Sequence, residues 1–148
     1  MIYIAVPALV DTNVLVYRFD PRFPDKQQRA RELLRQGIEE DNIRIPHQAL
    51  IEFVAATTRP LTRGSTQRLL STGEAQREIE EMLAQFSVLF PDEEVVRLAL
   101  RGSASYQLPW FDAHLWAYAE RFSLDTIWSE DFAHNRLYGR VRTKNPFL

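Results

Sequence analysis

The stretch Leu9-Val-Asp-Thr-Asn-Val-Leu-Val-Tyr17 decides the fold, because an apolar run ends in an acidic residue and a second apolar run follows it. Residues 8–10 predict a short buried strand, and residues 14–17 belong to the short helix that we expect to follow it. Asp11 would then stand at the carboxyl end of the first strand. Ligands of open parallel sheets bind in the crevice at that edge, so Asp11 is a candidate functional residue.

Strand and helix patterns alternate along the rest of the chain. Helices are predicted over residues 25–36, 46–58, 72–85, 92–103 and 110–120, and strands over 43–45, 87–90, 126–128 and 141–143. The strand at 87–90 is predicted to be buried. The helix at 92–103 is predicted to turn Val96 and Leu100 inward, beside Val95 and Ala99. This alternation predicts the α/β class, with a parallel sheet between helices, and no linker or repeat divides the single domain expected over 1–148.

The composition excludes several classes of protein. The 148 residues include no cysteine, which excludes thiolate catalysis, cysteine-bound zinc and iron–sulfur clusters. The net charge of −2 provides no overall positive field that would attract nucleic acid. The apolar residues 1–10 have no basic lead and are far fewer than the roughly 20 that cross a bilayer, so we expect a cytoplasmic protein with no membrane partner.

Four carboxylates stand out by their positions in the predicted elements. Asp11 ends the first strand, and Asp131 follows the strand at 126–128. Asp112 opens the most apolar helix, and Glu52 lies mid-helix among alanines. Carboxylates that gather without a cation repel one another, whereas Mg²⁺ or Mn²⁺ takes oxygen ligands and removes that repulsion. A metal held in this way can activate water for the hydrolysis of a phosphodiester.

Each of these acids also has a structural interpretation that involves no ligand. Asp112 is in the first turn of a helix, where the helix dipole favours a negative charge. Asp131 is suited to cap a following short helix, and Asp11 to cap the turn that begins at Asn13. Glu52 is compatible with a solvent-facing position. The sequence alone leaves these interpretations open.

Several arginines are candidates for contacts with phosphate groups, although a solvated arginine is the default interpretation of each. They are Arg18, Arg22, Arg59 and Arg63. The guanidinium group is a planar fork of donors that matches the oxygens of a phosphate. Local arginines and a bound cation would together supply the positive field that the whole chain lacks.

Four segments together resemble the PIN-domain family, and VapC-type toxin ribonucleases in particular. They are Leu9-Val-Asp-Thr-Asn-Val-Leu-Val-Tyr17, Pro46-His-Gln-Ala-Leu-Ile-Glu-Phe53, Trp110-Phe-Asp-Ala-His-Leu-Trp-Ala-Tyr-Ala119 and Ile127-Trp-Ser-Glu-Asp-Phe132. The resemblance covers residues 9–147. It implies a three-layer α/β/α sandwich around a mostly parallel sheet, and an endoribonuclease that depends on Mg²⁺ or Mn²⁺.

The resemblance also implies roles for individual residues. Asp11, Glu52, Asp112 and Asp131 take the acidic catalytic positions, with Asp11 and Asp112 holding the metal, and Thr12, Asn13 and Ser129 supporting them. Glu130 departs from the family pattern, because it places a second acid beside Asp131, and either of the two can face the site. The implied partners are an RNA substrate, a small cognate antitoxin protein and a second copy in a homodimer.

Two alternative functions remain at this stage. One is a PIN-like module that binds RNA or protein without catalysis, but all four acidic positions are filled. The other is a receiver domain that accepts a phosphoryl group on an aspartate. A receiver domain needs a lysine at the end of its last strand, and the only late lysine is Lys144, which follows a weak strand.

Overall fold

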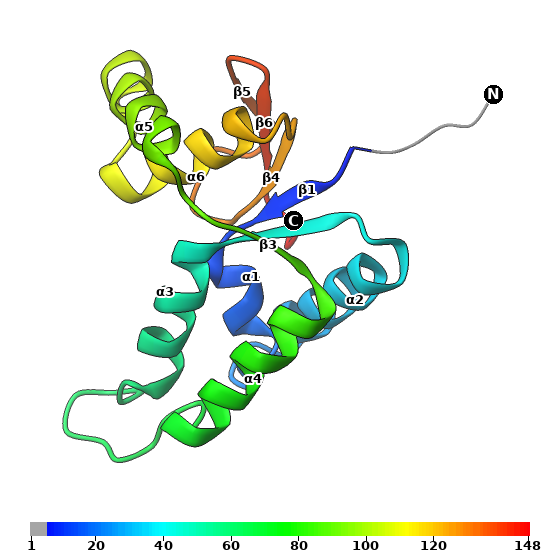
Figure 1. Ribbon diagram of the computed structural model, residues 1–148. Coiled ribbons are helices and arrows are strands. Elements are labelled where there is room, and N and C mark those ends of the chain that lie inside the picture. Colours follow the sequence, from blue (N-terminus) through cyan, green and yellow to red (C-terminus); the bar gives the residue numbers. More distant parts are fainter. Residues whose placement is uncertain (1–5) are drawn as a thin grey trace.

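The computed structural model describes residues 6–148, in which six strands and six helices are found (Figure 1). The strands are β1 (Ala8–Val10), β2 (Ile43–Pro46), β3 (Ser87–Leu89), β4 (Thr126–Trp128), β5 (Arg136–Tyr138) and β6 (Val141–Lys144). The helices are α1 (Thr12–Tyr17), α2 (Pro24–Glu40), α3 (His47–Thr58), α4 (Thr72–Gln85), α5 (Glu93–Tyr106) and α6 (Trp110–Arg121). Residues 1–5, the first part of the apolar N-terminal stretch, lie outside the described residues. Within 6–148, no helix has the length and hydropathy needed to cross a membrane.

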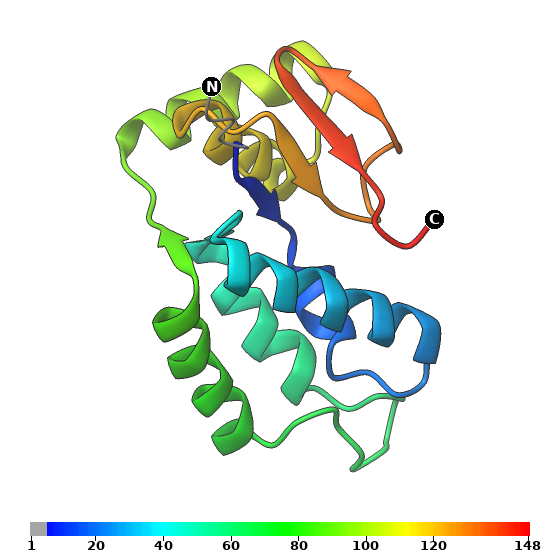
Figure 2. The same cartoon turned by 90° about the vertical axis from the view of Figure 1, so that its right-hand side faces the viewer.

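The strands form one sheet in the order β3-β2-β1-β4-β6-β5. All neighbouring strands are parallel except β5 and β6, which are antiparallel. Helices α5 and α6 cover one face of the sheet, and α1 to α4 cover the other, as the two perpendicular views show (Figures 1 and 2). The predicted fold class, an α/β/α sandwich around a mostly parallel sheet, is confirmed.

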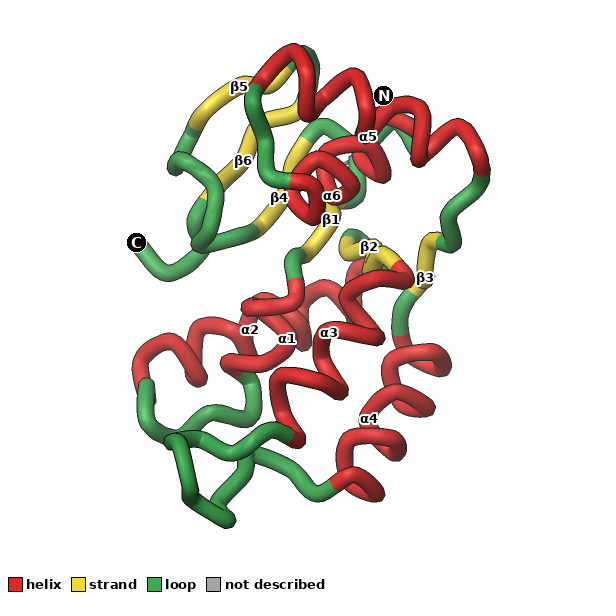
Figure 3. Tube along the Cα trace, turned by 90° about the vertical axis from the view of Figure 1, so that its left-hand side faces the viewer, coloured by secondary structure: helices red, strands yellow, loops and turns green. Residues whose placement is uncertain are grey.

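The central strand β1 contributes to the core on both faces of the sheet. Successive side chains of a strand point to opposite faces, and Leu9 packs with residues of α5 and α6 whereas Val10 packs with residues of α1 to α4. Both side chains are fully buried. This is why β1 is a continuous apolar run. The chain passes from β1 into α1 where the two layers of helices separate (Figure 3), and Asp11 is the residue between these two elements.

Helix α2 continues beyond the end that the sequence suggested, because Gly37 lies within it and not at its end. A side chain at position 37 would collide with Ile43, so the glycine allows α2 to pack closely against β2. The helix ends at Asp41, which adopts the left-handed conformation with a φ of 51°. A short polar residue tolerates that conformation better than a bulky one.

Two predictions about burial were wrong. Strand β3 is at the edge of the sheet, where its side chains are exposed or half-buried. In α5, Val95 and Ala99 are fully buried, but Val96 and Leu100 are 43% and 56% exposed. Helix α5 therefore turns only a narrow stripe of side chains toward the core.

Strand β5 was not predicted from the sequence. It pairs with β6 across a tight turn in which Gly139 has a φ of 63°. Its three residues are too few for a detectable alternation, and two of them are exposed.

Candidate active site

Asp11 occupies the junction between β1 and α1 and is held by bonds to both of its carboxylate oxygens. Its side chain is the N-cap of α1, since the amide of Thr12 donates to Oδ1 at 2.7 Å. The hydroxyl of Ser129 donates to Oδ2, also at 2.7 Å. Asp11 is only 5% exposed. The interpretation of Asp11 as a helix cap is therefore confirmed, and its functional role stays a prediction.

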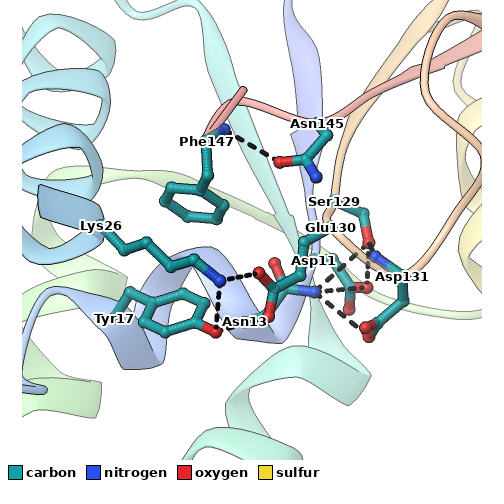
Figure 4. A network of polar contacts seen from close by, with 9 residues as sticks. All are labelled: Asp11, Asn13, Tyr17, Lys26, Ser129, Glu130, Asp131, Asn145 and Phe147. Carbon is teal, nitrogen blue, oxygen red and sulfur yellow. Dashed lines mark hydrogen bonds and ion pairs between the residues drawn. The ribbon is translucent and has the colours of Figure 1, made fainter. Parts of the chain in front are cut away.

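Asn13 connects Asp11 to the loop that follows β4 (Figure 4). Its Nδ2 lies 3.3 Å from Asp11 Oδ2, 3.3 Å from Ser129 Oγ and 3.2 Å from Asp131 Oδ2. The backbone amide of Asp131 donates to Ser129 Oγ at 3.1 Å. Two acids that are 120 residues apart in the chain are thus joined through one asparagine and one serine. No helix begins after Asp131 within the described residues, so its interpretation as a helix cap was wrong.

Glu52 is drawn into the same group from α3. The hydroxyl of Thr12 donates to Glu52 Oε2 at 2.6 Å, and Glu52 is half-buried. Since the amide of Thr12 also caps Asp11, one residue contacts both acids. The solvent-facing interpretation of Glu52 was therefore incomplete.

Asp112 is the fourth member of the group and lies in the first turn of α6, as predicted. Its pKa is raised above the ordinary value, first by partial burial and then by the negative charges of Asp131 and Glu52. These two acids are also the charges that raise the pKa of Asp11. Glu52 and Asp131 are therefore the shared electrostatic neighbours of Asp11 and Asp112.

Burial has the largest effect on the ionisation of Asp11. It raises the pKa of Asp11 from 3.8 to about 7, against the lowering effect of the hydrogen bonds from Ser129 and Thr12. A carboxyl group in this state exchanges a proton near neutral pH. It also gains from a cation that can replace the lost hydration.

The structure separates the two adjacent acids of the β4 loop. Glu130 turns away from the group and accepts bonds from the hydroxyl of Tyr17 at 2.6 Å and from Nζ of Lys26 at 2.9 Å. Asp131 faces Asn13 instead, as Figure 4 shows. No local pattern predicts this cluster of Tyr17, Lys26 and Glu130, because Lys26 and Glu130 are 104 residues apart.

The donor set of the acid group fits a hard divalent cation that keeps much of its water. All candidate ligands are oxygens, and the buried Oδ1 of Asn13 has no hydrogen-bond partner within residues 6–148. Within the described part of the chain, no three acidic or histidine side chains are placed so that they could hold a metal ion by themselves, so these side chains form no closed cage. Mg²⁺ does not need a closed cage, because it is commonly held by one or two carboxylates, by water and by substrate phosphates.

The fold and the acidic edge of the sheet together identify the family. The family model of the PIN domain matches residues 8–140, which include all four acids and every strand from β1 to β5. The chain therefore belongs to the PIN domain family.

Solved structures of toxin–antitoxin complexes share this fold. A toxin–antitoxin complex from Klebsiella pneumoniae is 19% identical, with 94% of this chain and 97% of that chain covered and a TM-score of 0.64. FitAB bound to a DNA fragment is 20% identical, with coverage of 95% and 96% and a TM-score of 0.68. DNA-bound VapBC from Salmonella typhimurium is 14% identical, with coverage of 96% and 99% and a TM-score of 0.65. At these identities the likeness concerns the fold alone. No curated protein matches the sequence.

Proposed function

We propose that this chain is an endoribonuclease dependent on Mg²⁺ or Mn²⁺, and the toxin of a toxin–antitoxin pair of the VapBC type. The observation that carries the proposal is the grouping of Asp11, Glu52, Asp112 and Asp131 at the carboxyl edge of the sheet. Membership of the PIN domain family supports it. The raised pKa values of Asp11 and Asp112 agree with acids that are held together for a cation.

In this proposal Asp11 and Asp112 hold the metal, and Glu52 and Asp131 complete its surroundings or orient water. When bound, the metal supplies a water of lowered pKa and stabilises the charge that develops on the phosphate. The described residues fix the acids beforehand. Ser129 and Asn13 hold Asp11 and Asp131 in place, at the distances given above.

Glu52 is the acid best placed to interact with a water molecule. Thr12 occupies its Oε2 and thereby fixes the orientation of the carboxylate. Its other oxygen, Oε1, makes no hydrogen bond within residues 6–148, so it is available to accept a proton from a water beside the phosphate. A carboxylate that is already oriented contributes more to catalysis than a freely rotating one.

The proposed protein partners are a small antitoxin and a second copy of the chain. One structure with the same fold is described as a toxin–antitoxin complex, and two others are FitAB and VapBC bound to DNA, which supports an antitoxin partner. Large apolar side chains on α3 and α6 are exposed, with Ile51 at 60% and Phe111 at 66%. A contact between copies would cover such side chains.

An RNA cleavage assay with Mn²⁺ or Mg²⁺ tests the proposal. We expect the native chain to cleave single-stranded RNA, chelation of the metal to stop it, and Asp11→Asn and Asp112→Asn each to lower the rate by at least about 100-fold. Glu80→Gln on the exposed face of α4 is the matched control, and should leave the rate unchanged. If the native chain binds Mn²⁺ and RNA but never cleaves, the non-catalytic alternative is correct. If the Asp11 variant cleaves as fast as the native chain, the assignment of the site is wrong.

A further inference from the structure

A hollow of about 270 Å³ lies beside the acid group and is not used in the chemistry proposed above. Its walls come from α1, from the turn between α1 and α2, from the end of α3 and from the loop after β4. Thr12 and Asn13 belong both to this wall and to the acid group. Any chain that crosses the acids can therefore continue directly into the hollow.

One wall of the hollow is aromatic. Phe23 is 43% exposed, and its ring meets the ring of Tyr17 edge to face, with centroids 5.7 Å apart. Tyr17 is itself fixed by its bond to Glu130, as Figure 4 shows. An exposed ring on a rigid support is a typical stacking platform for a base of single-stranded nucleic acid.

A second wall carries an arginine whose direction is fixed. Arg22 donates from Nε to Asp20 Oδ1 at 2.9 Å and from Nη2 to Asp20 Oδ2 at 2.8 Å. Asp20 is 3% exposed, so it is a rigid support, while the Arg22 side chain remains 47% exposed. The guanidinium carbon lies 5.5 Å from the centre of the Phe23 ring. The remaining donors of Arg22 are thus available next to the aromatic wall.

The charges around the hollow favour an anion. The two acids of its wall are already paired, Asp20 with Arg22 and Glu130 with Lys26. Arg59, at the end of α3, is exposed and makes no ion pair within residues 6–148. The hollow therefore has an available positive charge close to an acid group that would itself repel a nucleic acid.

We propose that this hollow binds one nucleotide of single-stranded RNA next to the phosphate that is cleaved. The base lies against Phe23, and Arg22 and Arg59 contact the sugar–phosphate backbone. The volume of about 270 Å³ lies at the lower end of the roughly 300–1,000 Å³ of typical ligand pockets, so the hollow has room for no more than one nucleotide. The inference rests on the proposed function, since it names the part of the RNA that flanks the reaction centre.

Binding of a fluorescent single-stranded hexanucleotide to the Asp112→Asn protein tests this proposal without any cleavage. Loss of a base stack weakens binding by about 5- to 150-fold, so we expect a loss of that size for Phe23→Ala. Phe23→Tyr should restore the affinity, because it keeps the ring. Arg59→Gln should weaken binding by about 3- to 10-fold. Arg97→Gln, on the exposed face of α5 and on the other side of the sheet, should not change it.

An abasic scan of the hexanucleotide identifies the contact directly. At one position, removal of the base should weaken binding to the parent protein but have no further effect on the Phe23→Ala protein. The proposal is overturned if Phe23→Ala and Arg59→Gln bind RNA as the parent does, or if Arg97→Gln weakens binding as much as they do. It is also overturned if the substitutions weaken only the binding of the cognate antitoxin, which would make the hollow a protein-binding site.

The two proposals can fail separately. If the native chain cleaves RNA with a metal but the substitutions at Phe23 and Arg59 change neither affinity nor KM, the hollow is not a nucleotide site and the nuclease remains. If RNA binds through Phe23 but no divalent metal supports cleavage, the nuclease fails and the binding site remains.

Discussion

The acid group has two sides that are built differently. Asp11 and Asp131 lie at strand ends, and a network of short hydrogen bonds through Ser129 and Asn13 fixes them. Glu52 and Asp112 come from helices on opposite faces of the sheet, α3 and α6, and approach the first pair across the crevice. The strand side is buried and rigid at Asp11, whereas both helix acids are only half-buried.

This difference indicates that the two sides of the acid group would contribute to metal binding in different ways. The strand side incurs the cost of desolvation in advance, so the pKa of Asp11 is about 7. The helix side keeps more of its hydration, and in the proposed metal complex it would interact with the cation mainly through electrostatic attraction. The predictions below test this difference, beginning with the largest expected effect.

Asp11→Asn should change how stability depends on pH in the metal-free protein. The folded-state pKa of Asp11 is about 7 and its ordinary value is 3.8, so the native chain binds this proton more tightly than the unfolded chain. The contribution of Asp11 to stability is therefore complete below about pH 4 and is lost as the pH rises through 7. We expect the free energy of unfolding of Asp11→Asn to exceed that of the native chain by about 1–3 kcal/mol at pH 8. Urea unfolding with EDTA present measures this difference. Parallel pH profiles of the two proteins would show that Asp11 is not the desolvated acid.

Added Mn²⁺ should restore the stability that the native chain loses when Asp11 ionises. A metal present at 100 times its Kd stabilises the folded state by about 2.7 kcal/mol. Because Asp11 must lose its proton to bind the metal, the apparent affinity should rise between pH 6 and 8, measured by calorimetry. In Asp112→Asn the affinity should fall, but the dependence on pH should remain. A pH-independent affinity in the native chain would contradict the role of the strand side.

Ser129→Ala and Asp112→Asn should have opposite effects on stability. Without the Ser129 hydroxyl, Asp11 loses a donor and the Asp131 amide loses its acceptor, which should cost about 1–3 kcal/mol. Asp112→Asn removes a charge that its neighbours oppose, and should leave stability equal or slightly higher at pH 8. Urea midpoints of the two variants check this. Equal losses would mean that the two sides are equally rigid.

The strand side was also easier to predict from the sequence than the helix side. An acid directly after a buried apolar run lies at the end of a strand, so the place of Asp11 followed from the pattern. The pattern also placed an acid just beyond the strand at 126–128, but left open whether Glu130 or Asp131 faces the site. The sequence could also place Asp112 in a first turn. It could not show that Thr12 bonds Glu52, because that contact joins residues 40 apart through tertiary packing.

Predictions failed where tertiary context outweighs the local pattern. Val96 and Leu100 fit an amphipathic helix, but α5 buries only the stripe that contains Val95 and Ala99. The three-residue β5 exists because β6 offers a partner across Gly139, and no local signal marks it. Similarly, the sequence could not decide between Glu130 and Asp131, which required knowing where Lys26 lies.

The smallest expected effect on stability comes from substitutions at the neighbouring acids Glu130 and Asp131, which should differ in their effect on Mn²⁺ binding. Glu130→Gln keeps a partner for Tyr17 but loses the charge that pairs with Lys26, an ion pair with both side chains partly exposed, at 38% and 22%. It should cost only about 0.5–1 kcal/mol of stability and leave Mn²⁺ affinity within about twofold. Asp131→Asn should change stability as little, because Asp131 is exposed, yet it should weaken Mn²⁺ binding by about tenfold or more. Calorimetric titration with Mn²⁺ measures the dissociation constant of each variant, and urea unfolding measures its stability. If Glu130→Gln weakened Mn²⁺ binding as much as Asp131→Asn, then Lys26 and Tyr17 would also influence the metal site. The strand side of the acid group would in that case extend to α2.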